Sequence, residues 1–371
     1  MDVISLTQKL ISFNTINPPG NEALLAEFIG GILAENGFSV EYINYDEGRK
    51  HLIAEKGVSS SGNPLIFSGH FDTVPLGNQT WSFNPMIGDI EGDKIYGRGS
   101  SDMKSALAAM ICALIDLTAK EIPKDGIRLI LTAAEELGCH GIQQIVKDYN
   151  LPDNASAIVI GEPTGNVPAI GHKGAIYLNA VALGKTAHSS MPELGINAIY
   201  RAAHAISKIE AFRFNAEKDV LLGLPTINVG KINGGMNINS VPDRAEFTID
   251  IRTTTSVNHD EILDRLSREL GSEIALEKLI DLKPVRTDEQ DPFVQLVYKI
   301  CLKEDVCEPL PLALSYLTDG SVLQDYYGQI PTIILGPGQP EMAHKTDEFC
   351  YISKIEQAVS IYKNIILKWR N

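Results

Sequence analysis

The sequence predicts an α/β protein in which a larger domain, a mixed sheet flanked by helices, is interrupted by an inserted α+β domain. The chain has 371 residues, the length of about two domains. Helical and strand patterns alternate in its first part, which is typical of a sheet covered by helices. From about Lys173 the pattern changes, and after Lys283 the first pattern returns.

In the first part of the chain, apolar patterns predict two helices and three strands. An amphipathic helix is expected at about 21–37 and a buried strand at 64–67. A long apolar helix is expected to follow Asp102, with Asp102 as its N-cap. Two more apolar strands are expected at 127–132 and 157–160. This alternation implies a largely parallel sheet with helices on both faces.

The inserted segment is expected to be a compact unit of its own, a four-stranded antiparallel sheet with two helices. The expected boundaries are 1–172 and 284–371 for the larger domain and 173–283 for the inserted one. In chain order the insert has a strand at 176–183, a helix at 197–212, strands at 226–231 and 246–252, a helix at 259–270 and a strand at 273–282.

After the insert, the larger domain is expected to resume with mixed α/β character. It continues through residues 291–303, a strand at 332–335 and a closing helix at 354–369. The two separated segments of the larger domain would then share one sheet.

Composition and charge argue against several classes of protein. Hydrophobic residues make up 44% of the chain, which provides for a sizeable core. The 32 Lys and Arg against 47 Asp and Glu give a net charge of -15, unfavourable for binding nucleic acid because phosphates need clustered basic residues. No apolar stretch reaches about 18 residues, so no membrane span is expected.

The N-terminal sequence and the cysteines indicate the compartment. The first residues lack the basic and long apolar regions of a secretory signal. The cysteines are scattered and form no CxxC pair, which argues against a disulfide framework and a cysteine-rich zinc site. We therefore expect a cytoplasmic protein with buried thiols. The cysteines are Cys112, Cys139, Cys301, Cys307 and Cys350.

Acidic residues and histidines follow the ends of several predicted strands. Sites of open α/β sheets lie beyond the carboxyl ends of the strands, so these side chains are expected to converge. Imidazole nitrogen and carboxylate oxygen suit Zn²⁺, and one carboxylate between two metals makes a two-metal hydrolytic site. Each residue alone could be a surface pair, a helix cap or a loop residue, but their co-occurrence indicates a metal site. They are His70, Asp72, Asp102, Glu135, Glu136, Glu162 and His344.

Four segments around these residues resemble the M20 metallopeptidase family. They are Ser68–Pro75, Tyr96–Lys104, Ala134–Gly138 and Gly161–Thr164, and all motifs occur in family order along nearly the whole chain. Members of the family include acetylornithine deacetylases, succinyl-diaminopimelate desuccinylases, aminoacylases and carboxypeptidases. The resemblance implies a zinc-peptidase-like fold for the larger domain and a ferredoxin-like dimerisation domain for the insert.

The resemblance also assigns metal ligands. His70 and Glu162 would bind one Zn²⁺, Glu136 and His344 the other, and Asp102 would bridge the two ions. Co²⁺ or Mn²⁺ are possible substitutes, because the same ligands accept them.

Further roles follow from the same resemblance. Glu135 would be the general base, and Asp72 would orient the His70 imidazole. His188, within Lys185–Pro192, would reach the active site of the partner subunit in a homodimer and donate to the oxyanion, although it could also be an ordinary loop histidine.

Two residues of the insert resemble family positions that hold the substrate carboxylate. They are Asn239 and Arg252, and arginine suits a bidentate carboxylate contact. Arg252 could equally pair with a sheet neighbour such as Glu246.

The expected function is therefore that of a dizinc amidohydrolase that removes an acyl group from an N-acyl amino acid. Residues 335–348 resemble acetylornithine deacetylases more than desuccinylases, and 315–320 departs from the Gly-Thr-Ser-Asp typical of desuccinylases. N-acetylornithine or a similar compound is therefore favoured over succinyl-diaminopimelate, and a dipeptidase or carboxypeptidase is an alternative. A catalytically silent binding protein would be recognised by the loss of a ligand, and none is missing here.

Overall fold

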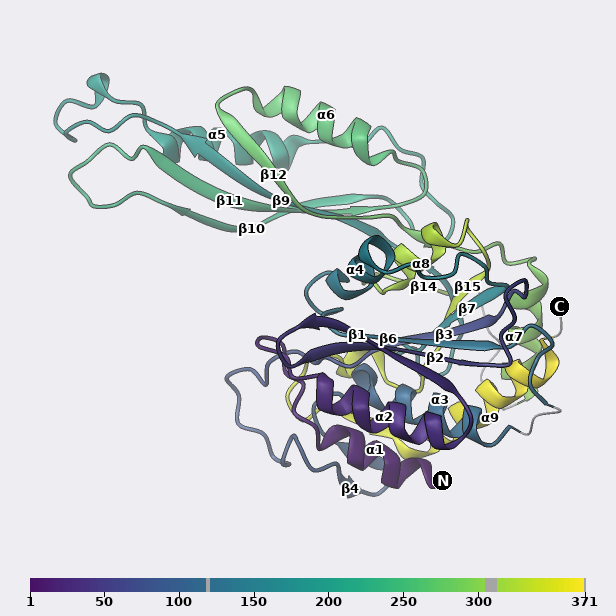
Figure 1. The fold of residues 1–371 in the computed structure, drawn as a ribbon. Helices are drawn as coiled ribbons and strands as arrows, with labels where there is room; N and C mark the ends of the chain where they lie inside the picture. Colours follow the sequence, from purple (N-terminus) through teal and green to yellow (C-terminus); the bar gives the residue numbers. More distant parts are fainter. Residues whose placement is uncertain (118–120, 304–311, 370–371) are drawn as a thin grey trace. The chain divides into compact units, whose positions relative to one another are not determined.

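The computed structural model describes residues 1–117, 121–303 and 312–369 (Figure 1). Within these ranges the chain forms two compact units. Unit 1 comprises Met1–Gly171, Val285–Ala313 and Thr318–Asn371. Unit 2 comprises His172–Pro284 together with the short return Leu314–Leu317.

The main sheet follows the order β1-β2-β6-β3-β7-β15-β8-β13, with β14 paired to β8. β3 is parallel to β6 and β7, and β7 is parallel to β15, whereas β2 is antiparallel to both of its neighbours. The sheet is therefore mixed, as the fold class predicted. Its strands are β1 (Ser39–Asp46), β2 (Arg49–Lys56), β3 (Leu65–His70), β6 (Ile127–Thr132), β7 (Ala157–Ile160), β8 (Ala169–His172), β13 (Val285–Arg286), β14 (Leu312–Leu314) and β15 (Thr332–Ile334).

Helices cover both faces of this sheet, with α4 and α8 on one side and α1, α2, α3 and α9 on the other (Figure 1). Every residue of α3 from Ser105 to Leu114 is buried, which is the pattern of a helix enclosed by its neighbours. The helices of unit 1 are α1 (Val3–Ile11), α2 (Ala23–Glu35), α3 (Ser105–Ile115), α4 (His140–Asp148), α7 (Pro292–Lys303), α8 (Gly320–Tyr326) and α9 (Ile352–Lys368).

The expectation that Asp102 caps α3 is wrong. α3 begins at Ser105, and Ser100–Lys104 forms a separate π-helical turn in which Asp102 has non-helical dihedral angles. The backbone N–H of Asp102 donates to Glu348 Oε1 at 3.0 Å, so this residue is held by a distant segment of the chain. The Asp102 carboxylate is therefore not used as a cap.

A small antiparallel sheet in order β16-β5-β4 completes unit 1. It consists of β4 (Asp89–Glu91), β5 (Lys94–Tyr96) and β16 (Phe349–Tyr351). A 3₁₀ turn, Pro340–Met342, precedes β16 in the chain.

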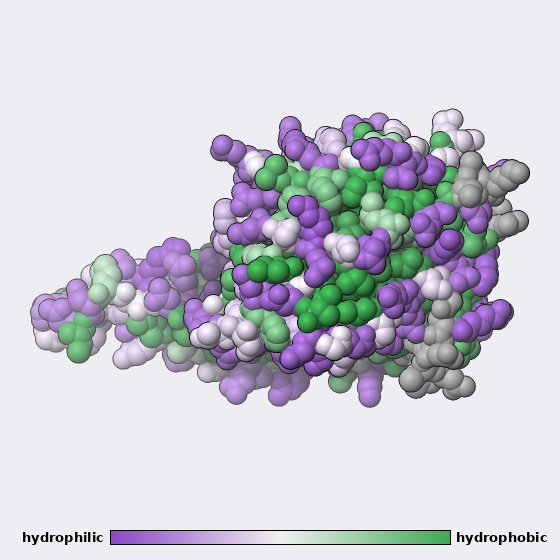
Figure 2. Space-filling model, turned by 90° about the horizontal axis from the view of Figure 1, so that it is seen from below, coloured by the Kyte–Doolittle hydropathy of each residue, from purple (hydrophilic) through white to green (hydrophobic). Residues whose placement is uncertain are grey.

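Seen from the side of α1 and α2, unit 1 shows apolar side chains among polar ones (Figure 2). Leu24 of α2 and Ile90 of β4 are exposed large apolar residues of this unit. No helix within the described ranges is long and apolar enough to cross a membrane. Cys112, Cys139, Cys301 and Cys350 are buried thiols, and Cys307 lies outside the described residues.

Unit 2 is an antiparallel sheet in order β10-β11-β9-β12 with α5 and α6 packed on one face (Figure 1). Burial alternates along β9 and β11, so every second side chain enters the core beneath the helices. Asn197 and Asn258 cap the two helices by accepting main-chain hydrogen bonds. The elements are β9 (Gly174–Leu183), a 3₁₀ turn (Pro192–Leu194), α5 (Ala198–Ala211), β10 (Thr226–Gly234), β11 (Arg244–Thr253), α6 (His259–Leu270) and β12 (Ile274–Leu282).

Candidate metal centre

Three adjacent parallel strands of unit 1 deliver acidic and imidazole side chains to one edge of the sheet. β3 ends at His70, β6 is followed by Glu135 and Glu136, and β7 is followed by Glu162. Because β6, β3 and β7 are neighbours and run in the same direction, these residues emerge side by side.

The side chains form two groups that share Asp102. In the first group, His70 Nε2 lies 3.1 Å from Asp102 Oδ1 and 3.5 Å from Glu162 Oε1. In the second, His344 Nε2 lies 3.1 Å from Glu136 Oε2 and 3.5 Å from Asp102 Oδ2. Within each group the potential ligand atoms lie within 4.8 Å of one another. The two oxygens of Asp102 therefore face different groups.

The electrostatics of the two groups favour binding of cations. Burial and the neighbouring Asp102 carboxylate raise the pKa of both Glu136 and Glu162. Hydrogen bonds to Asp102 and Glu136 raise the pKa of His344 to about 10, although its side chain is 56% exposed. Glu136 Oε1 is buried and has no hydrogen-bond partner among the described residues. These nitrogen and oxygen donors, crowded with negative charge, fit divalent metal ions.

Glu135 lies beside these groups without belonging to either. Burial, followed by the negative charge of Glu162, raises its pKa well above the ordinary value. The Cys139 thiol donates to Glu135 Oε1 at 3.3 Å. Asp319 lies in the same buried cluster, and the Thr132 hydroxyl donates to its Oδ2 at 2.5 Å.

Asp72 orients both His70 and the glutamate pair, but through different atoms. His70 Nδ1 donates to the main-chain carbonyl of Asp72 at 2.9 Å, whereas the nearest carboxylate oxygen is 3.6 Å away. The Asp72 carboxylate accepts from the backbone N–H groups of Glu135 and Glu136, at 3.1 and 3.2 Å, and from the Asn17 amide at 2.9 Å. Because a carbonyl only accepts, Nδ1 of His70 carries a proton and Nε2 faces the first group.

Several residues that support this site were not predicted from the sequence. Cys139 was predicted only to be one of the scattered buried thiols. Asp319 was considered only as part of residues 315–320, which bear on substrate choice. Glu348 lies four residues after His344, and Arg98 lies in the segment that contains Asp102, so both occur in motifs already recognised. Their burial was the missing information, because an exposed and a buried carboxylate look alike in a sequence.

A further buried histidine near the site is His51. Its Nδ1 accepts from the backbone N–H of Ala133 at 3.0 Å, two residues before Glu135, and its Nε2 lies 3.0 Å from Gln144 Oε1. Burial lowers its pKa to about 4, so the ring is neutral near pH 7. His51 therefore packs against the segment that leads to Glu135.

The remaining predicted site residues belong to unit 2. His188 is exposed, and its Nδ1 accepts from the backbone N–H of Ser190 at 3.2 Å, which leaves the proton on Nε2. Asn239 is also exposed and adjacent, since its carbonyl accepts from Ser189 N at 3.1 Å.

Arg252 lies at the opposite end of β11 from these two residues. The strand has ten residues and therefore spans about 33 Å. Arg252 donates to both carboxylate oxygens of Asp250, at 2.9 and 3.2 Å, and to the Tyr177 hydroxyl at 2.5 Å. Its ion-pair partner is thus Asp250 rather than Glu246, the neighbour considered from the sequence.

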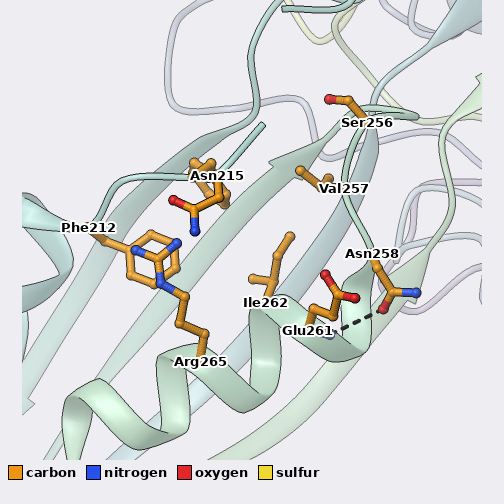
Figure 3. A pocket seen from close by; sticks show the side chains of 9 residues that line it. Phe212, Asn215, Ser256, Val257, Asn258, Glu261, Ile262 and Arg265 are labelled. Atoms are coloured by element: carbon orange, nitrogen blue, oxygen red, sulfur yellow. Dashed lines mark hydrogen bonds between the residues drawn. The ribbon is translucent and has the colours of Figure 1, made fainter. Parts of the chain in front are cut away.

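A separate pocket of about 100 Å³ opens on unit 2 where α6 begins (Figure 3). The Arg265 guanidinium lies 4.4 Å from the centre of the Phe212 ring, and Glu261 N donates to Asn258 Oδ1 at 3.2 Å. None of the predicted site residues lines this pocket. Its lining is Phe212, Phe214, Asn215, Ser256, Val257, Asn258, Glu261, Ile262 and Arg265.

The fold and this site define a metal-dependent hydrolase, and comparison with known proteins gives the family. Residues 66–368 match the family described as peptidase family M20/M25/M40, so the chain belongs to that family. The family recognised from the sequence motifs is thereby confirmed, and the chain is a metal-dependent amidohydrolase.

Two relatives and one solved structure illustrate the similarity. The chain is 28% identical to a probable succinyl-diaminopimelate desuccinylase of Staphylococcus epidermidis, covering 98% of this chain and 96% of the relative. It is 29% identical to an acetylornithine deacetylase of Vibrio atlanticus, covering 94% and 92%. An M20 family metallo-carboxypeptidase of Sulfolobus solfataricus has the same fold, with a TM-score of 0.83, 21% identity and coverage of 99% of both chains.

Proposed function

We propose that the protein removes the acyl group from an N-acyl amino acid with the help of two Zn²⁺ ions. His70 and Glu162 would hold one ion, Glu136 and His344 the other, and Asp102 would bridge them. The observation that carries this proposal is the orientation of Asp102, whose two oxygens face two separate histidine-carboxylate groups. Co²⁺ or Mn²⁺ could occupy the same donors.

The chain's own groups account for the proton transfers. Bound Zn²⁺ would supply Lewis acidity, which lowers the pKa of water toward about 7 and polarises the amide carbonyl. Glu135 takes the proton from the attacking water and returns it to the nitrogen of the leaving amine. The Cys139 thiol holds Glu135 Oε1, and the Asp72 carboxylate holds the main chain of Glu135.

Unit 2 would complete the site of a second subunit in a homodimer. His188 presents an Nε2–H that can donate to the oxyanion of the tetrahedral intermediate. It lies beyond the end of β9, a strand of ten residues that spans about 33 Å. The resemblance of the segment around His188 to the family's dimerisation-domain motif supports a role for His188 in the active site of the partner subunit.

Asn239 and Arg252 would bind the substrate's carboxylate. The Arg252 guanidinium is already oriented by Asp250 and Tyr177, so it loses little freedom when it binds a planar anion. Asn239 lies beside His188, so the same subunit of the homodimer would supply both residues to a given active site.

The favoured substrate is N-acetylornithine or a similar N-acyl amino acid, as residues 335–348 suggest. The similarity to a desuccinylase and to a deacetylase is nearly equal, so it does not decide between them. Succinyl-diaminopimelate and dipeptides are the alternative substrates. We also propose a cytoplasmic location, which the buried thiols support because such thiols suit a reducing compartment.

The direct test is a substrate panel with the Zn²⁺-loaded protein. It contains N-acetylornithine, N-succinyl-diaminopimelate, N-acetylmethionine and several dipeptides, and kcat/KM is measured for each. We expect a preference of about 10³ or more for one N-acyl amino acid, because polar groups in a pocket reject substrates that leave them unpaired. No turnover of any compound by protein with two bound metals would support the silent binding protein instead.

A further inference from the structure

A buried ion pair, Arg98 and Glu348, lies behind the proposed ligands. Both side chains are almost fully buried, with exposed fractions of 2% and 0%, and Arg98 Nη1 lies 2.7 Å from Glu348 Oε2. Burying two opposite charges gives little net stability, because both lose their hydration. The pair is therefore better understood from the segments that it holds in place.

Glu348 holds the turn that carries the bridging aspartate. Its Oε1 accepts from the backbone N–H groups of Ser101 and Asp102, at 2.8 and 3.0 Å. Its Oε2 accepts from the backbone N–H of Gly99 at 3.0 Å as well as from Arg98. One carboxylate thus fixes three main-chain groups of the segment that ends at Asp102.

Arg98 connects this turn to the segments of both ligand histidines. Its Nη2 donates to the carbonyl of Pro75, five residues after His70, at 3.0 Å. Its Nη1 also donates to the carbonyl of Lys345, the residue after His344, at 3.2 Å. The ion pair therefore joins the segments that contain His70, Asp102 and His344.

We propose that Glu348 and Arg98 are positioning residues that set the metal affinity of the site by fixing Asp102 between its two groups. This rests on the ligands named in the proposed function. Glu348 touches no proposed ligand side chain by these contacts, so its effect reaches the site through the Asp102 main chain. Residues that orient metal ligands typically change metal affinity about 10–100-fold when they are replaced.

Glu348→Gln is the central variant, because it keeps the shape of the side chain. The amide nitrogen replaces one oxygen, so at least one main-chain N–H of the turn loses its acceptor. The matched control is Glu22→Gln. Glu22 is equally buried and accepts two hydrogen bonds from Arg49, at 2.6 and 2.8 Å, but its partner does not belong to the segments that contain the ligands.

The measurement is Zn²⁺ affinity by competition with a fluorescent chelator, together with the Tm of the metal-free proteins. We expect both variants to lower the Tm, Glu348→Gln to weaken Zn²⁺ binding about 10–100-fold, and Glu22→Gln to stay within about twofold of the wild type. Wild-type affinity in Glu348→Gln, or an equal loss in Glu22→Gln, would overturn the proposal.

A second variant and the Zn²⁺ affinity of the wild type distinguish failure of the inference from failure of the proposed ligands. If Glu348→Gln does not fold, Arg98→Lys replaces it, since lysine can pair with Glu348 but cannot span both the Pro75 and Lys345 carbonyls. We expect about tenfold weaker Zn²⁺ binding, and unchanged binding would overturn the proposal. If the wild type itself binds no Zn²⁺, the proposed ligands and this inference both fail, whereas tight wild-type binding with no effect of the variants rejects only the inference.

Discussion

Most of the proposed site residues of unit 1 are buried, whereas two of those of unit 2 are exposed. In unit 1, His70 and Glu162 are buried, and the main chain around them is fixed by side chains such as Asp72. In unit 2, His188 and Asn239 are exposed on loops beyond the ends of the strands. A buried charged site has to be completed by its own fold or by bound cations. In the proposed function, by contrast, the exposed residues of unit 2 would act only against a second surface.

Glu135→Gln should have the largest effect. The amide cannot accept the proton of the attacking water, so kcat should fall about 10²–10⁴-fold or more. The metal content should not change, because Glu135 belongs to neither ligand group. Turnover and bound metal are measured on the same preparation, and wild-type kcat with full metal content would exclude Glu135 as the base.

His188→Ala should lower kcat about 10²–10³-fold, the usual cost of losing one oxyanion donor. Because His188 is exposed, the Tm and the Zn²⁺ affinity should remain those of the wild type. A change in Zn²⁺ affinity would show instead that His188 belongs to the metal site.

Mixing the two inactive variants tests whether His188 acts in the partner's site. In a mixed dimer of Glu135→Gln and His188→Ala subunits, one of the two sites keeps both Glu135 and His188. After subunits are exchanged at equal concentration, activity should rise to about a quarter of the wild-type value, because half of the dimers are mixed. Activity that stays at the level of the separate variants would argue against this arrangement.

Arg252→Ala should act mainly on substrate binding. The loss of a bidentate contact with a carboxylate should raise KM by about one to two orders of magnitude and change kcat less. Asp250→Asn is a useful companion, since it leaves the arginine in place and removes the group that orients it. A selective loss of kcat in Arg252→Ala would mean that the residue acts in the transition state.

His51 should make the stability of unit 1 depend on pH. Its pKa is about 4 in the folded protein and about 6.5 in an unfolded chain, so the unfolded state binds the proton first as pH falls. The contribution of neutral His51 to the free energy of unfolding is therefore fully present above about pH 6.5 and is lost as pH falls toward 4. At pH 5 the free energy of unfolding should be about 2 kcal/mol lower than above pH 6.5. Urea unfolding of the wild type and His51→Gln at pH 7.5 and 5 measures this. The difference in unfolding free energy between the wild type and His51→Gln should be smaller at pH 5 than at pH 7.5. An equal difference at both pH values would contradict the proposed effect of His51.

Local patterns in the sequence predicted much of the fold. The bounds of α6, β6 and β7 agree with the prediction, because periodicity and limits such as the Asn258 cap are local signals. α1, α4 and the pairing of β1 with β2 were not predicted. The start of α3 was misplaced, because a contact between Asp102 and Glu348, 246 residues apart, decides it.

The candidate site shows the same limit. The motifs indicated which residues would converge, but not which atoms would meet. That the carbonyl of Asp72 holds His70 while its carboxylate holds Glu135 depends on the fold of the turn. Asp319 becomes a neighbour of Glu135 only through tertiary packing, which no spacing in the sequence reveals. Cys139, four residues after Glu135, reaches it through a local turn that was not predicted.

In the proposed site, two metal ions lie on either side of the Asp102 carboxylate. Crystals of the Zn²⁺-loaded protein, measured with X-rays at the zinc absorption edge, test this arrangement most directly. We expect two anomalous peaks, one between His70, Asp102 and Glu162 and the other between Asp102, Glu136 and His344. A single peak, or peaks away from Asp102, would contradict it.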